Sequence, residues 1–129
     1  MEVNREEEEL SYTITIKRVA READLTFTDG GKTITAKCYW NSKKKIPAGT
    51  YLNCSATTMS KKKNSKGMPR EAVFIPNVKG YTEIFIHMGK PPYDIWSDGC
   101  LVIDEAKMIE IYSAISPKNG HNVKIVITG

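Results

Sequence analysis

Apolar and polar residues alternate along short segments of this chain, and turn residues separate the segments. In the first segment Tyr12, Ile14 and Ile16 alternate with threonine and lysine, which is the period of a strand with one buried face. The last segment repeats this pattern at Val123, Ile125 and Ile127. Segments of this kind fold into a sheet whose apolar face must be covered. The alternation therefore predicts a mainly β fold.

Turn and cap residues divide the chain further. Gly30 and Gly31 separate two alternating segments and predict a hairpin. A strand is expected from Thr50 to about Thr58, and the polar segment 61–67 is expected to be a loop. Asp104 precedes the one helical pattern and is a good N-cap; the apolar face is Met108, Ile111, Tyr112 and Ile115. We expect about seven short strands, forming a small sandwich or barrel, and one helix near the C-terminus.

Length and charge indicate one domain with an acidic tail. A chain of 129 residues can bury a sufficient core as one domain. We expect residues 1–9, rich in glutamate, to be a disordered tail and residues 10–129 to be the domain. The N-terminus lacks a signal-peptide pattern, and no apolar run is long enough for a bilayer. These features predict synthesis in the cytoplasm and no membrane partner.

The three cysteines are expected to be free thiols. An odd number cannot pair within one chain, and their spacing matches no zinc motif. We expect a reducing compartment and no metal or cofactor. Cys38 and Cys54 are interpreted as small core residues. Cys100 has a different sequence context.

His87 and Cys100 form the candidate catalytic pair. His87 comes near the end of an apolar segment that predicts a strand, and Cys100 follows a short connection and the sequence Ser97-Asp98-Gly99. A neighbouring imidazole can generate the thiolate that makes cysteine a strong nucleophile. Gly99 permits a positive φ immediately before the cysteine. Ser97 and Asp98 are candidates to orient the imidazole or fix the turn. Cysteine and histidine are also common core residues, so an inert pair remains the alternative.

Three short motifs resemble the catalytic domain of the L,D-transpeptidase (YkuD-like) superfamily. The stretches are Ile46–Tyr51 (Ile-Pro-Ala-Gly-Thr-Tyr), Asn77–Gly89 with its Ile-x-Ile-His-x-Gly end, and Asp98–Ile103 with its Gly-Cys pair. They are most similar to a small phage and bacterial family of unknown function with these motifs in this order. The resemblance covers residues 10–128 and implies the YkuD-like fold.

The resemblance also implies roles for the site residues. Cys100 would be the nucleophile, His87 the general base, and the backbone N–H groups of Gly99 and Cys100 the oxyanion donors. The implied substrate is a peptidoglycan stem peptide, cleaved at a diaminopimelate–D-alanine bond through a thioester. A protein made in the cytoplasm would reach the wall by a phage or secretion route.

Substrate-binding residues are expected around this pair. Gly89 shapes the loop after His87, and Tyr93 and Trp96 in the loop are candidates for a wall that gates the substrate. The alternative for these aromatic residues is packing on the core. Superfamily members carry an arginine two residues after the cysteine, where this chain has Val102. Arg70 is a candidate replacement, with an exposed surface arginine as the alternative.

The segment 41–70 is strongly basic and suggests a second class of function. It contains no acidic residue, and its cations are Lys43, Lys44, Lys45, Lys61, Lys62, Lys63, Lys66 and Arg70. Such a surface attracts small anions or nucleic acid. No aromatic residue interrupts the run 61–66, although single-strand binding surfaces use aromatic residues for stacking. The alternatives to an enzyme are therefore a non-catalytic module of the same fold, binding an anionic ligand, nucleic acid or a protein, and a solvated loop.

Overall fold

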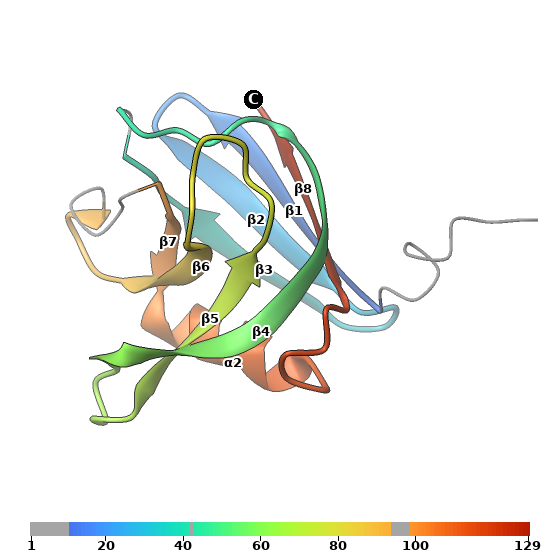
Figure 1. Cartoon of the computed structure of the whole chain (residues 1–129), viewed down its shortest axis with the longest axis vertical. Coiled ribbons are helices and arrows are strands. Elements are labelled where there is room, and N and C mark those ends of the chain that lie inside the picture. The colour runs from blue at the N-terminus through green and yellow to red at the C-terminus, as the bar shows by residue number, and fades with distance from the viewer. Residues whose placement is uncertain (1–10, 42, 94–98) are drawn as a thin grey trace, which may run out of the picture.

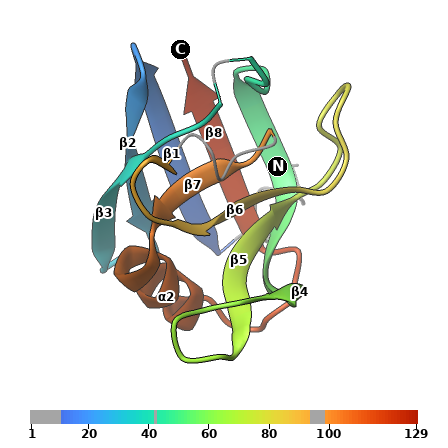
Figure 2. The ribbon, with the colours of Figure 1, turned by 90° about the vertical axis from the view of Figure 1, so that its left-hand side faces the viewer.

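The computed structural model describes residues 11–41, 43–93 and 99–129. Within these ranges eight strands form one sheet in the order β3-β2-β1-β8-β4-β5-β6-β7 (Figures 1 and 2). The elements are β1 (Tyr12–Val19), β2 (Glu22–Thr28), β3 (Thr33–Cys38), β4 (Gly49–Lys63), β5 (Pro69–Ile75), β6 (Ile84–Gly89), β7 (Leu101–Asp104), α2 (Glu105–Ala114) and β8 (Val123–Thr128). The expected mainly β fold with a helix near the C-terminus is confirmed. The expected acidic tail lies outside the described residues.

The sheet curves until its two edges meet, so it is nearly closed into a barrel. Tyr39, directly after β3, bridges Val102 of β7. The N–H of Tyr39 donates to the Val102 carbonyl at 2.9 Å, and the N–H of Val102 donates to the Tyr39 carbonyl at 2.8 Å. Closure satisfies backbone groups that an open edge would expose.

Alternate residues of the strands fill the barrel. The buried cluster contains Ile14, Ile16, Leu25, Phe27, Val73, Ile75, Ile84, Ile86, Leu101, Ile103, Val123, Ile125 and Ile127. Helix α2 packs against β3, β5, β6 and β7 and covers the core below β6 and β7 in Figure 2. No helix in the described part of the chain is long and apolar enough to span a membrane.

The predicted hairpin and helix cap are both present. β2 and β3 pair antiparallel, with Thr28 opposite Thr33 and Gly30 at φ 87° in the turn. The Asp104 carboxylate accepts a hydrogen bond from the Ala106 N–H at 3.0 Å and begins α2. On the apolar face of the helix, Met108, Ile111 and Ile115 are buried and Tyr112 is partly buried.

The prediction of a loop over residues 61–67 is only partly correct. Residues 61–63 belong to β4, which pairs with β5 as far as Lys63 opposite Pro69. The turn is shorter and centres on Asn64, whose N–H donates to the Met68 carbonyl at 2.8 Å. This end of the hairpin extends beyond the core and exposes its lysines. An apolar alternation is absent there because neither face needs to be buried.

Candidate active site

The parallel pairing of β6 with β7 places His87 and Cys100 on the same outer face. Ile84, Ile86 and Met88 point into the core, so Phe85 and His87 point outward. In register, His87 lies opposite Val102, and residues opposite each other share a face. Cys100, two residues before Val102, therefore shares the face of His87.

Three rows of outward-facing residues cross β4, β5, β6 and β7. The printed pairing gives the second row in full: Thr57, Ala72, His87 and Val102. Extending the same registers by two residues adds Cys100 to a first row of Ser55, Phe74 and Phe85, and joins Met59 and Arg70 to Gly89 and Asp104 in a third. Cys100 is thus diagonal to His87, and residues in such a pair lie about 7–8 Å apart, with Cβ atoms somewhat closer. The register therefore puts the two residues of the predicted pair on neighbouring strands, and contact between the sulfur and the imidazole stays a prediction.

The Cys100 sulfur lies at the wall of a cavity. Its side chain is 8% exposed, and its Sγ accepts a hydrogen bond from the Phe85 N–H at 3.4 Å. The thiol in turn donates to the Glu83 carbonyl oxygen at 3.8 Å, so the sulfur has both a donor and an acceptor within reach. The cavity of about 430 Å³ is lined by Thr58, Met59, Ser60, Lys61, Lys62, Glu83, Phe85 and Cys100. Lys61 and Lys62 bring two positive charges to this lining, and Glu83 brings one negative charge.

His87 is buried and its ring is fixed by the backbone. It is 5% exposed, and its Nδ1 lies 2.9 Å from the carbonyl oxygen of Met88. Because a carbonyl only accepts, Nδ1 carries the proton and Nε2 is the basic nitrogen of the neutral ring. This is the tautomer that a general base acting through Nε2 requires.

Gly99 has the conformation expected from the sequence. Its φ is +97°, in the region that side chains disfavour. A Cβ atom there would lie 2.9 Å from Cδ1 of Ile84 and 3.0 Å from Cδ1 of Tyr81. Backbone angle and close packing both require glycine immediately before Cys100.

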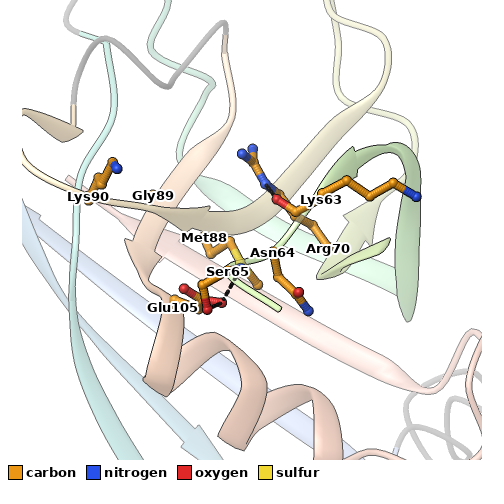
Figure 3. A pocket seen from close by; sticks show the side chains of 8 residues that line it. All are labelled: Lys63, Asn64, Ser65, Arg70, Met88, Gly89, Lys90 and Glu105. Carbon is orange, nitrogen blue, oxygen red and sulfur yellow. Dashed lines mark hydrogen bonds between the residues drawn. The ribbon is translucent and has the colours of Figure 1, made fainter. Parts of the chain in front are cut away.

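Arg70 and Gly89 line a second cavity, of about 210 Å³, together with Met88 (Figure 3). The Arg70 Nε donates to the Lys63 carbonyl at 2.7 Å, which fixes the plane of the guanidinium. Lys63 and Lys90 also line the cavity, and so does Glu105. Hydrogen bonds from the Ser65 backbone N–H and hydroxyl lower the pKa of Glu105. With three cations against one carboxylate, this cavity suits an anion.

The remaining predicted site residues are only partly described. The Tyr93 ring stacks on Tyr39, with ring centroids 4.4 Å apart and planes 6° from parallel. Because Tyr39 bridges Val102, this stacking places Tyr93 beside the strand that follows Cys100. Ser97, Asp98 and Trp96 lie outside the described residues.

Cys38 and Cys54 are buried in the core, as expected. Both are 0% exposed, and burial raises the pKa of each thiol to about 12. They are therefore poor nucleophiles at neutral pH. Among the described residues no group of three or more His, Cys, Asp or Glu side chains could hold a metal ion.

A pair that the sequence did not reveal lies at the other end of the first row. His121, in the turn before β8, is exposed. Its Nδ1, however, lies 3.3 Å from the hydroxyl of buried Ser55, and both residues line a cavity of about 280 Å³. The two residues are 66 positions apart in the chain, so no local pattern could predict their contact.

Comparison with solved structures shows the fold. An L,D-transpeptidase from Mycobacterium smegmatis matches with a TM-score of 0.56 at 11% identity, over 92% of this chain and 59% of that chain. The L,D-transpeptidase LdtMt1 in complex with imipenem matches with a TM-score of 0.55 at 12% identity, over 92% and 59%. The helical cell shape determining protein Pgp2 from Campylobacter jejuni matches with a TM-score of 0.51 at 13% identity, over 91% and 47%.

The chain has the L,D-transpeptidase (YkuD-like) fold. It spans between 47% and 59% of the length of these three chains. Neither a protein-family model nor a curated protein matches it.

Replacing Gly99 by alanine should destabilise the protein more than the same change at Gly67. Gly67 has φ +78° but open space around a Cβ, so Gly67→Ala tests backbone strain alone, about 1 kcal/mol. Gly99→Ala adds the overlap with Tyr81 and Ile84, for a total of about 3 kcal/mol. Urea unfolding of both variants measures the difference. Equal losses would show that the packing around Gly99 is unimportant.

The three cysteines should differ in alkylation rate. At pH 8 a pKa of about 12 leaves only about one thiol in 10,000 ionised, so Cys38 and Cys54 should react slowly, their rates rising roughly tenfold per pH unit. Cys100 should react at least about tenfold faster, and His87→Ala should slow it. Iodoacetamide labelling with peptide mass spectrometry measures each site, and labelling in urea is the control. Equal, slow labelling of all three would favour a non-catalytic binding module.

Proposed function

We propose that this protein is a cysteine acyl-transfer enzyme that acts on peptidoglycan stem peptides. The observation that supports the proposal is the parallel register of β6 and β7, which sets His87 opposite Val102, two residues after Cys100, while Cys100 lines a cavity. Two of the matching structures of the same fold are L,D-transpeptidases, which supports the reaction class. The fold by itself does not carry the function.

The reaction would proceed through a thioester. His87 Nε2 takes the proton of the Cys100 thiol, and the thiolate attacks the carbonyl carbon of the diaminopimelate–D-alanine amide. As the tetrahedral intermediate collapses, the C–N bond breaks and the imidazolium gives its proton to the departing D-alanine amine. Water then releases the acyl group as an acid, or a second amine takes it as a new amide.

Backbone groups beside the sulfur would stabilise the oxyanion. The N–H groups of Gly99 and Cys100 are the candidates, because they precede β7 at the turn where Gly99 adopts its positive φ. Preorganised donors of this kind contribute about 3–4 kcal/mol to transition-state stabilisation. The close packing of Gly99 against Tyr81 would keep them in position.

Arg70 would bind the carboxylate of the departing D-alanine. Cys100, His87 and Arg70 lie in three successive rows of the outer face, in the order nucleophile, proton carrier and cation. A substrate with its carbonyl at Cys100 and its leaving amine near His87 therefore extends its terminal carboxylate towards Arg70. Guanidinium groups suit such carboxylates because they bind them in a bidentate manner.

The proposal includes the place where this activity occurs. The substrate lies in the cell wall, and a phage or secretion route would bring the protein there. The alternative is a non-catalytic module of the same fold that binds an anion, and the cations around the second cavity favour it. The alkylation experiment above separates the two.

Imipenem is the probe that tests the enzyme proposal most directly. Thiolate attack on its β-lactam carbonyl opens the ring without a leaving group, so the protein should gain the whole mass of one imipenem. Intact-protein mass spectrometry should show this adduct in the wild type and not in Cys100→Ala, with Cys54→Ala as the matched control that retains it. A parallel incubation with a stem tetrapeptide should release D-alanine in the wild type only. The absence of both products would remove the proposal.

Arg70→Ala should abolish the preference for a free terminal carboxylate. With the wild type, kcat/KM should be about tenfold or more higher for a peptide ending in D-alanine than for its amide, as expected for a charged hydrogen-bonded contact. Arg70→Ala should bring the two substrates close together, mainly through KM. Arg21, exposed at the turn before β2, offers a matched control. An unchanged preference in Arg70→Ala would place carboxylate recognition elsewhere.

A further inference from the structure

The cavity beside Ser55 and His121 continues the groove that begins at Cys100. It is lined by Ser55, Thr57, Thr58, Phe74, Phe85, Asn119 and His121. Phe85 and Thr58 also line the cavity of Cys100, so the two cavities adjoin. The Phe74 and Phe85 rings, 5.3 Å apart, form the floor between them. A substrate acylated at Cys100 can therefore extend along the first row.

The His121 ring is held in one orientation. The Ser55 hydroxyl, 4% exposed, accepts the His121 N–H at 2.8 Å and lies 3.3 Å from Nδ1. Because a buried hydroxyl proton needs an acceptor, it donates to Nδ1. The ring proton is then on Nε2. An exposed histidine thus presents a fixed N–H donor at the rim of an aromatic cavity.

The loop that carries this donor is both strained and anchored. His121 has φ +53° and Asn119 has φ +57°, a region that non-glycine residues rarely adopt. The Asn119 N–H donates to the Ala56 carbonyl at 2.8 Å, and the His121 N–H donates to Ser55, so β4 holds the loop at two points. Such strain persists only where surrounding contacts impose it, and it is concentrated at ligand sites.

We propose that this cavity is a second subsite, which binds an uncharged, partly apolar segment of the acyl side of the peptide substrate. The phenyl rings would contact apolar groups, and His121 Nε2–H would donate to a carbonyl oxygen. Three strand spacings separate Cys100 from Ser55, about 14 Å, which an extended peptide spans in about four residues. The leaving group extends the opposite way, towards Arg70. This inference rests on the proposed function.

The test compares a short and a long donor peptide. Both end in diaminopimelyl-D-alanine; the short one is acetylated on diaminopimelate, and the long one carries acetyl-L-alanyl-D-isoglutaminyl there, so the added segment is uncharged. In the wild type, the ratio of kcat/KM for long over short donor, measured by D-alanine release, should be about tenfold. His121→Gly, which removes the ring and relieves the positive φ, should bring the ratio near one. His121→Asn, which keeps an N–H donor and tolerates this backbone, should restore part of it.

Controls separate failure of the subsite from failure of the enzyme proposal. Thr35→Ala, an exposed change on the distant strand β3, should leave the ratio unchanged. A wild-type ratio near one, or a ratio unaffected by His121→Gly, would overturn the subsite while leaving acyl transfer intact. Lack of turnover with either peptide would overturn the enzyme proposal instead. NMR titration of Cys100→Ala with the long peptide then decides: shifts at the His121 ring and Phe74 support the subsite, and their absence overturns it.

Discussion

The parallel pairing of β6 with β7 is the constraint on which the candidate site depends. The hydrophobic core fixes the register of this pairing, because Ile86, Met88, Leu101 and Ile103 must all face the core. A slip of one residue would turn these side chains outward and carry His87 inward. The hydrophobic effect thus aligns a polar site on the opposite surface of the same strands. Core packing and site geometry cannot vary independently here.

The two faces of the sheet give the three cysteines two different settings. Cys38 and Cys54 belong to the buried cluster inside the barrel, where burial raises the pKa of each thiol to about 12. Cys100 faces the other way and lies at a cavity bordered by lysines. The reactivity expected of each thiol follows from the face of the sheet that it occupies.

Local patterns in the sequence predicted local structure well. Alternation predicted the strands, Gly30 the hairpin turn, Asp104 the helix cap and Gly99 the positive φ before Cys100. The sequence could predict which residues lie on adjacent strands only where the connection between the strands was short, as it is between His87 and Cys100. The contact of Ser55 with His121 could not be predicted in this way. It depends on the pairing of β8 with β4, which the whole sheet determines. The lysine-rich end of β4 was missed because a hairpin beyond the core has no apolar pattern.

The bridge between Tyr39 and Val102 has a consequence for how the protein could be divided. Without it, the four residues of β7 would form the outermost strand and would have hydrogen bonds on one side only. A segment starting after Tyr39 would contain Cys100, His87 and Arg70 and still lack the residue that holds the nucleophile's strand from the other side. The N-terminal third of the chain, which supplies none of the reacting groups, is thus required for their rigidity. Two separately expressed halves would therefore have to re-form the hydrogen bonds between Tyr39 and Val102 before they could restore activity.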